Sequence, residues 1–334
     1  MELEKIFTEN PEEGEFRSLG LCFGGFGLDR QDVRERSNDE RFSAFYGVSA
    51  KTLLAVFVDV KDANPSIKTK DFFMTVSELK LYLTEHVQAG IWGIDENTFR
   101  RRWKEVMKAI ASMSSEKIKF DPDDFPAEQI FILSVDGVNF TIHEPRAKDP
   151  GSHWYDHKSH SAGLSYEVAV DIRRSRILWI KGPRPGKEEH CLFSYLAPGI
   201  IIYLPTSTLY NCLAHCSIAS VSESVTFNGG KKKDKIKDLN CLSAKIPEGK
   251  RAIADSGLRG SAKVSTTKAG HSKEAKKFMS RVRSRMETLF LRFKNFGILR
   301  QRFRHDIELH RDILLAVAVL VAYDMENGHP LFDV

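Results

Sequence analysis

The sequence predicts a mixed protein of the α+β kind, in which a helical region precedes a region that contains a sheet. Apolar residues recur at helical spacing through residues 41–118. Residues 131–193 instead hold four short runs typical of strands, and consecutive strands favour a meander over βαβ repeats. Two further helical patterns follow at 276–297 and 310–328. A chain of 334 residues accommodates about two such domains.

Composition permits a sizeable core and sets few limits on partners. The chain is 42% apolar and carries a net charge of +5, so the position of its charges matters more than their sum. Five cysteines, an odd number, do not form a disulfide framework and favour a reducing compartment. The acidic N-terminus does not resemble a signal peptide. The longest apolar run, 313–323, is too short for a bilayer and predicts a buried helix and no membrane.

Breaks in composition predict how the chain is divided. Residues 1–40 are polar, glycine-rich and then charged, which predicts a flexible N-terminal arm. Residues 41–119 form the predicted helical domain, and the Pro- and Asp-rich stretch 120–129 marks its end. A second domain is expected over 126–334. Within it, residues 194–241 are Ser/Thr/Cys-rich and end in a basic run, so we expect an insertion there.

The helical domain has the pattern of a helix-turn-helix. Thr75 and Glu78 form a capping-box pattern that predicts a helix start, and a glycine-bearing connector leads to a second helix capped by Asp95 or Asn97. The apolar stripe of that second helix consists of Phe99, Trp103, Val106, Met107 and Ile110. The cations that lie largely off this stripe are Arg100, Arg101, Arg102 and Lys104. They predict either contact with DNA or a solvated basic face.

Residues 131–142 combine a strand pattern with a carboxylate. An apolar run ends at Asp136 and Gly137, and apolar and polar residues then alternate up to Ile142. A carboxylate in an apolar sheet is costly without a partner, and a metal ion is one such partner. The alternative is a hairpin turn, because Asp-Gly between apolar runs is a common turn signal.

Two later stretches add further acids. A short apolar strand at 252–254 delivers Asp255 to a Ser-Gly turn. In the helix 276–297, Glu287 lies at one edge of the apolar stripe, and Arg283 precedes it by one turn on the same face. Two strand-end aspartates and a helix glutamate are one way to hold two divalent cations, which prefer carboxylate oxygens and can promote attack on a phosphodiester.

The three blocks resemble a known family. SVDGVNFTI around Asp136, AIADSGLRG around Asp255 and the series Arg283-x3-Glu287-x6-Lys294 are similar, in this order, to motifs of DDE-superfamily endonucleases and transposases of the Harbinger type. That family is related to bacterial insertion-sequence transposases. Intervening strand sequences and the C-terminal ENGHPLF also resemble it, so the resemblance covers roughly residues 70–334 outside the insertion.

This resemblance implies a fold, an activity and a site. The fold is ribonuclease-H-like, with a mixed five-stranded sheet and helices on both faces. The activity is that of a metal-dependent DNA nuclease or transposase, in which Asp136, Asp255 and Glu287 are catalytic and bind two Mg²⁺ or Mn²⁺ ions. Arg283 and Lys294 would hold DNA phosphates or orient the glutamate. The implied partners are DNA, a Myb-like DNA-binding companion and a second copy of the chain. The implied location is the nucleus if the source is eukaryotic, and otherwise the cytoplasm.

Departures from the family pattern support an alternative hypothesis. Leu258 and Ser280 stand where the family usually has tyrosine, and Glu189 stands where it usually has aspartate. These differences, together with the insertion, are also typical of a domesticated, catalytically inactive DNA-binding protein derived from a transposase. Both hypotheses retain a DNA-binding face.

Three other clusters leave their interpretation open. Cys212, His215 and Cys216 have zinc-like spacing, but no second half-site follows, so an inserted loop is the alternative. A histidine-rich loop suits either metal binding or a DNA-facing surface; its members are His153, His157 and His160. From Lys273 to Arg311 there are 12 Lys and Arg against four acids, which suits a DNA backbone or a solvated helix face.

Overall fold

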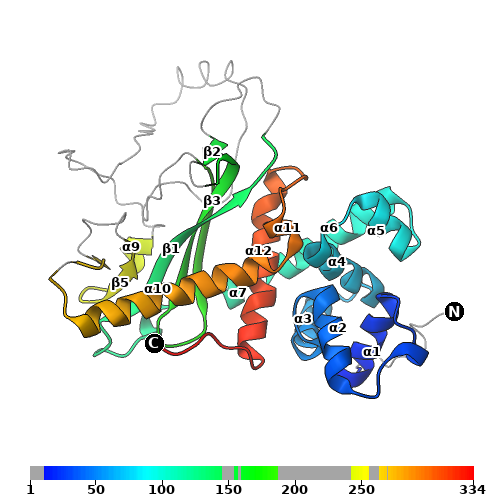
Figure 1. Cartoon of the computed structure of the whole chain (residues 1–334), viewed down its shortest axis with the longest axis horizontal. Helices are drawn as coiled ribbons and strands as arrows, with labels where there is room; N and C mark the ends of the chain where they lie inside the picture. The colour runs from blue at the N-terminus through cyan, green and yellow to red at the C-terminus, as the bar shows by residue number, and fades with distance from the viewer. Residues whose placement is uncertain (1–10, 145–153, 157–158, 187–241, 256–262, 269) are drawn as a thin grey trace, which may run out of the picture.

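A computed structural model describes residues 11–144, 154–156, 159–186, 242–255, 263–268 and 270–334. Helices α10 and α12 lie against a twisted sheet, and the N-terminal helices form a lobe beside them (Figure 1). The predicted α+β class is therefore confirmed. Several features of the sequence lie outside the described residues: the insertion 194–241 with its zinc-like spacing, His153, His157, Glu189 and Leu258.

The N-terminal region folds into helices earlier than predicted. Helix α1 spans Glu13–Phe23, a 3₁₀ turn η2 spans Leu28–Arg30, and α2 spans Glu35–Tyr46. The prediction of a flexible arm is therefore wrong for residues 11–40. The average polarity of this stretch is high, but Phe16 and Leu19 lie on one face of α1 and are buried, and the ring of Phe16 lies 4.6 Å from that of Phe73.

The remaining N-terminal helices follow with short connections. They are α3 (Ala50–Ala63), α4 (Thr69–Leu81), α5 (Glu85–Trp92), α6 (Glu96–Ser112) and α7 (Ser114–Lys117). The predicted N-cap Asp95 is confirmed, since its carboxylate accepts a hydrogen bond from the Thr98 amide at 2.9 Å. The capping box was wrong: Thr75 lies inside α4 and donates to the Asp71 carbonyl, because buried residues extend that helix toward its N-terminus.

The sheet contains six strands in the described residues. They are β1 (Phe131–Thr141), β2 (Tyr155–Asp156), β3 (Ser161–Asp171), β4 (Ile177–Pro185), β5 (Arg251–Ala254) and β6 (Val264–Ser265). β1 runs unbroken through Asp136 and Gly137, so the hairpin-turn alternative is wrong. β3 pairs antiparallel with β1, β2 and β4, whereas β5 is parallel to both β1 and β6. The described sheet therefore has one strand more than the five that the resemblance implies.

The two long C-terminal helices pack on one face of the sheet. They are α10 (Lys273–Lys294) and α12 (Glu308–Glu326), with the single turn α11 (Gly297–Arg300) between them. Val138, Phe140 and Tyr166 point to this face and share a core with α10, α11 and α12. Among the described residues, the opposite face packs against side chains from α9 (Leu242–Lys245) and from around the 3₁₀ turn η3 (Pro122–Asp124). Helices on both faces were predicted, and the described residues place two long helices on one face and the single turn α9 on the other.

The helical lobe and the sheet share one hydrophobic core. Helix α12 packs between α6 and the sheet, and its apolar stretch is buried as predicted. The boundary placed at residues 120–129 is therefore a break in chain composition and not a gap between two cores. No single helix in the described part is long and apolar enough to cross a membrane. Helices α2 and α3, which are bent by 51° relative to each other, have the length and composition of a membrane span only when they are taken as a pair.

The end of α4 docks on the junction between α10 and α11. The Lys80 ammonium donates to the carbonyl and the side-chain oxygen of Asn295 at 2.9 and 2.6 Å. Gln301 donates to the Leu81 carbonyl at 3.3 Å. Gly297 makes this contact sterically achievable, because a Cβ atom there would lie 2.7 Å from the Lys80 carbonyl oxygen. This junction fixes how the helical lobe meets the sheet.

Gly297→Ala should destabilise the protein. The added methyl group must displace backbone atoms of α4, and overpacking of this kind costs about 1–3 kcal/mol. Gly90→Ala is the matched control, because a Cβ at that position in α5 meets nothing within 4 Å, and alanine should stabilise the helix by about 0.5–1 kcal/mol. Urea unfolding of the two variants measures both effects, and equal midpoints would contradict the close packing at Gly297.

Candidate acidic site

Two of the three predicted carboxylates lie side by side in the sheet. Val135 of β1 pairs with Ala254 of β5 in parallel register, so Asp136 and Asp255 occupy the next level of two neighbouring strands. Asp136 is opposite Val168 in β3 and shares its face, because paired residues of adjacent strands point to the same side. Asp255 shares the face of Ile253, since side chains alternate along a strand.

Helix α10 covers this same face and carries Arg283 and Glu287, the other two side chains of the predicted site. Ile253 packs with Met279 and Val282 of α10, which anchors the first half of the helix over β5. Arg283 follows directly, and its guanidinium lies 3.0 Å from the Asp255 carboxylate. Glu287 is one turn further along the same flank and is exposed. We call Asp136, Asp255, Arg283 and Glu287 the acidic site.

The acidic site does not form a ready metal site with its side chains as they lie. Among the described residues, no three His, Cys, Asp or Glu side chains are placed to hold one metal ion. The donor chemistry suits Mg²⁺ or Mn²⁺, because carboxylate oxygens are the ligands these ions prefer. However, Asp255 is engaged by Arg283, so a cation already contacts one of the three proposed ligands. Lys294, the other cation predicted here, is exposed at the last residue of α10.

A buried carboxylate lies on the reverse face of the sheet. Glu167 of β3 is opposite Gly137 and therefore one register position from Asp136, but its side chain points away from α10. Burial raises its pKa to about 8, against opposing contributions from Arg184 and Lys181 of β4. Sequence alternation in β3 could have shown the face of Glu167, but its burial depends on the tertiary fold.

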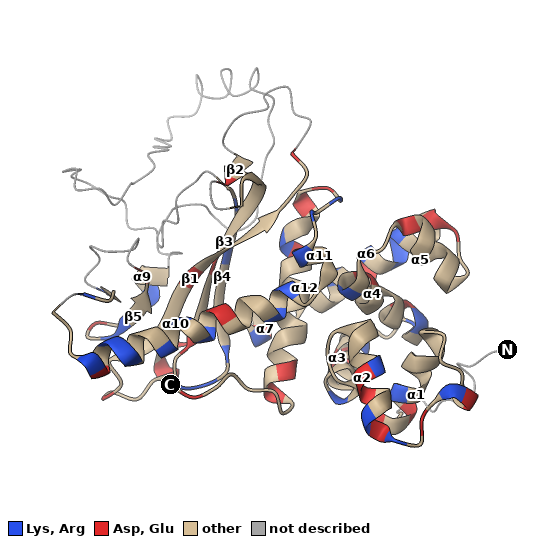
Figure 2. Cartoon of the chain, in the orientation of Figure 1, with Lys and Arg blue, Asp and Glu red and all other residues tan. Residues whose placement is uncertain are grey.

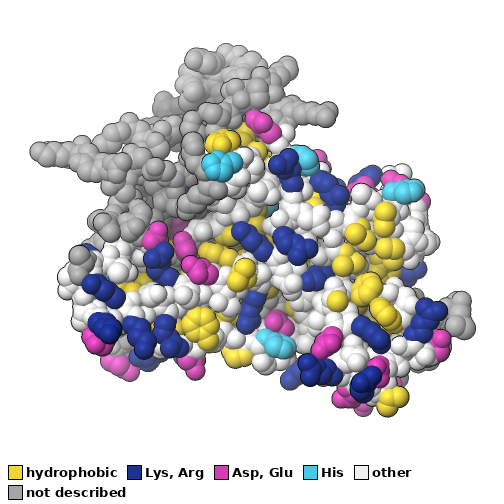
Figure 3. All heavy atoms as spheres, viewed as in Figure 1, with side chains coloured by type: hydrophobic (Ala, Val, Ile, Leu, Met, Phe, Trp, Pro, Cys, Tyr) yellow, Lys and Arg dark blue, Asp and Glu magenta, His cyan; other side chains and the backbone are white. Residues whose placement is uncertain are grey.

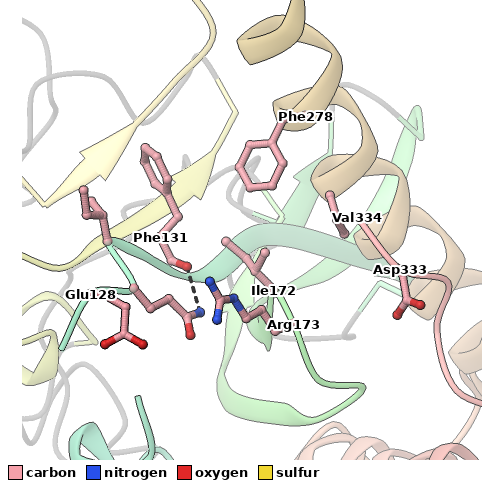
Figure 4. A pocket seen from close by; sticks show the side chains of 9 residues that line it. Glu128, Phe131, Ile172, Arg173, Phe278, Asp333 and Val334 are labelled. Atoms are coloured by element: carbon pink, nitrogen blue, oxygen red, sulfur yellow. Dashed lines mark hydrogen bonds between the residues drawn. The ribbon is translucent and has the colours of Figure 1, made fainter. Parts of the chain in front are cut away.

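A hollow of about 470 Å³ lies at the other end of the same strands, where β1 begins (Figure 4). Phe131 and Phe278 face each other across it, with Arg173, Glu128 and Asp333 around its rim. The rings of Phe131 and Phe278 are 6.2 Å apart. The lining includes no residue of the acidic site, so this hollow is separate from it.

The four predicted DNA-contacting cations of α6 fall into two groups. Arg100 forms an ion pair with Glu85 of α5, and Arg102 forms one with Asp71 of α4 at 3.1 Å. These two cations therefore connect the three helices, which the sequence did not indicate. Arg101 is exposed and Lys104 is half-buried, and neither has an ion pair with a described carboxylate. The predicted apolar stripe of α6 is confirmed, since all five of its residues are buried.

The basic residues from Lys273 to Arg311 also fall into two groups: some make structural contacts and others are exposed. Arg285 is buried, and Arg281 and Arg292 donate to carbonyl groups near the C-terminus. Basic residues also recur along the outer side of α10 and at α11 (Figure 2). Dark blue side chains lie near the middle of this face of the molecule, between the two lobes (Figure 3). Lys294, Arg300 and Arg302 are exposed and have no ion pair within the described structure. We call these three residues the basic surface.

Sequence reasoning missed Lys80 as a neighbour of this basic surface. Its pKa is lowered by burial and by the nearby charge of Arg300, which shows that the two cations lie close together. Lys80 and Asn295, which it contacts, are 215 residues apart in the chain. No local pattern could have indicated that proximity.

Comparison of the chain with protein-family models, with curated proteins and with solved structures gives no match. The fold and the acidic site therefore stand on their own geometry.

Proposed function

We propose that the protein is a metal-dependent DNA endonuclease or transposase. The observation that carries this proposal is the acidic site: two aspartates at one level of neighbouring parallel strands, under a helix that presents Arg283 and Glu287 on the adjoining flank. Three carboxylates from two strands and one helix can hold divalent cations, which would stabilise the attacking and leaving oxygens of a phosphodiester. The resemblance of the three sequence blocks to the Harbinger type supports the same proposal.

The strand arrangement supports a ribonuclease-H-like fold for this proposal. β4, β3 and β1 are consecutive neighbours in antiparallel pairing, and β5 and β6 continue the sheet in parallel beyond β1. Such a mixed order is the one that the resemblance implies. The packing of the long helices on one face is its main difference from the expected architecture.

We also propose that DNA is the partner of the helical lobe. α5 and α6 are joined by three residues, with Gly93 in the left-handed conformation at φ 62°, and a short turn with a glycine is common in a helix-turn-helix. Arg101 and Lys104 of α6 then serve as contacts to phosphates or bases, while Arg100 and Arg102 stabilise the helix arrangement. A Myb-like companion and a nuclear location belong to the same proposal.

The variant Lys294→Gln/Arg300→Gln should weaken DNA binding and lower its salt dependence. Both side chains are exposed and have no ion pair within the described structure, so they are available to phosphates. Loss of two phosphate contacts should reduce the slope of log K against log salt by about 1.8. Fluorescence anisotropy with a labelled duplex at several salt concentrations measures this slope. Lys51→Gln/Lys68→Gln removes the same charge from exposed sites in the helical lobe, and an equal loss there would show an unspecific charge effect.

One observation favours the alternative of an inactive DNA-binding protein. Arg283 is paired with Asp255, and no group of three metal ligands is assembled among the described residues. A protein that has lost cleavage could keep this ion pair permanently while retaining the helix-turn-helix and the basic surface. Calorimetric titration with Mn²⁺ separates the two functions: the nuclease should bind the ion through Asp136, whereas the inactive protein should bind none.

A further inference from the structure

The contact between Arg283 and Asp255 joins two partly exposed side chains. The Arg283 side chain is 42% exposed and the Asp255 side chain 46% exposed, and ion pairs at such sites contribute only about 0–1 kcal/mol to stability. In addition, Arg283 Nε is buried and has no hydrogen-bond partner within the described structure. The guanidinium is therefore held through one edge and is not fixed by a surrounding network.

Other arginines of α10 show what a structural role looks like in this protein. Arg285, two residues further on, is 2% exposed and donates to the carbonyl groups of Ile172 and Arg174. Arg281 donates to the carbonyl of Asp333. Both side chains are bonded to neutral backbone groups. Among the described arginines of this helix, Arg283 is the one that contacts a carboxylate proposed to bind a metal.

A divalent cation at Asp255 and the guanidinium of Arg283 are mutually unfavourable. Both are positive, and like charges a few ångströms apart repel each other even near a protein surface. The carboxylate can be neutralised by either cation, and the ion pair as observed provides that neutralisation without metal. Arg283 thus competes with any metal for Asp255.

We propose that Arg283 is an exchangeable counter-cation of the acidic site. The inference rests on the proposed nuclease function and adds its regulation: a divalent cation displaces the guanidinium from Asp255, and the released side chain then pairs with a phosphate of the bound DNA strand. The site is closed to metal when Arg283 is in place and opens when an anion draws the guanidinium away. Metal and DNA consequently favour each other's binding.

Mn²⁺ titration calorimetry of the full chain at constant ionic strength tests the exchange. Arg283→Gln removes the competing charge and should bind Mn²⁺ about threefold to tenfold more tightly than the wild type. Arg283→Lys keeps the charge and should stay close to the wild-type affinity. Arg281→Gln is the matched control, since it makes the same change of charge two residues away, and it should alter the affinity by less than about twofold.

The outcomes separate the inference from the proposed function. If Arg283→Gln binds Mn²⁺ no more tightly than Arg281→Gln, the exchange is overturned and the metal site itself stands. If Arg283→Gln binds no Mn²⁺ at millimolar concentration, the metal-dependent function fails and the exchange fails with it. The variant Arg283→Gln/Asp255→Asn should lose the gain in affinity; a gain that persists without the Asp255 carboxylate would also overturn the exchange.

Discussion

Glu287→Gln is expected to reduce Mn²⁺-dependent nicking of supercoiled DNA by roughly a thousandfold, the scale of loss when one member of a catalytic group is removed. The side chain is exposed on α10, so the substitution should leave the fold intact. Asp136→Asn should have a similar effect on nicking. In both variants the affinity for DNA should stay within a few-fold of the wild type, because the helical lobe and the basic surface are unchanged.

A matched control for Glu287→Gln lies on the same helix. Glu274→Gln makes the same change in the first turn of α10, between three and four turns away from Glu287, and should leave nicking within about twofold of the wild type. Equal activity of the Glu287→Gln and Glu274→Gln variants would remove Glu287 from the site. A wild-type protein that binds DNA but does not cut it in Mg²⁺ or Mn²⁺ would instead favour the inactive DNA-binding alternative.

The second large effect concerns the stability of the fold in acid. His310 of α12 is fully buried against Tyr166 and Phe303, and its Nδ1 is hydrogen-bonded to the Tyr166 hydroxyl at 2.8 Å. Burial lowers its pKa from 6.5 to about 3. Below pH 6.5 the unfolded chain therefore takes up a proton that the folded protein rejects, and stability is lost as the pH falls. Between pH 7 and pH 5 the loss should be about 2 kcal/mol, at 1.36 kcal/mol for each unit below 6.5.

Comparison with a variant is needed because Glu167 has the opposite effect. Its folded-state pKa is raised from 4.5 to about 8, so its contribution is full below pH 4.5 and is lost as the pH rises toward 8. The two slopes oppose each other between pH 4.5 and 6.5. Urea unfolding of His310→Phe against the wild type isolates the histidine, and the variant should lose about 2 kcal/mol less on going from pH 7 to pH 5. A wild-type slope in His310→Phe would contradict the buried neutral histidine.

Local patterns predicted the parts of this structure that local energetics control. The strands before Asp136 and Asp255, the stripe and N-cap of α6, and the helix that carries Glu287 all appear where the sequence placed them. Alternation and helical spacing reflect which face of an element is buried, so they survive in the fold. The adjacency of the two aspartates was expected only from the family resemblance, because parallel pairing of β1 with β5 joins segments more than 100 residues apart.

The missed features depend on tertiary contacts. Residues 11–40 are polar on average, yet a few aromatic residues such as Phe16 are enough to dock α1. The capping pattern at Thr75 predicted a helix start that the structure does not have. Because Phe72 and Phe73 are buried, α4 begins before them and Thr75 lies inside the helix. The ion pairs of Arg100, Arg102 and Arg283 could not be read from charge runs, because their partners lie on other elements. A run of Lys and Arg residues in a sequence does not show which side chains form ion pairs or which carboxylates are their partners.

The docking of α4 on the α10–α11 junction has a consequence for how DNA would be processed. Packing and a shared core, not a tether, join the lobe that holds α6 to the sheet that holds the acidic site. If the protein has the proposed function, its strand breaks would fall at a constant distance, in base pairs, from the DNA sequence that the helical lobe binds. A change in this distance would require the interior of the protein to repack. Insertions in surface loops should therefore leave the distance unchanged.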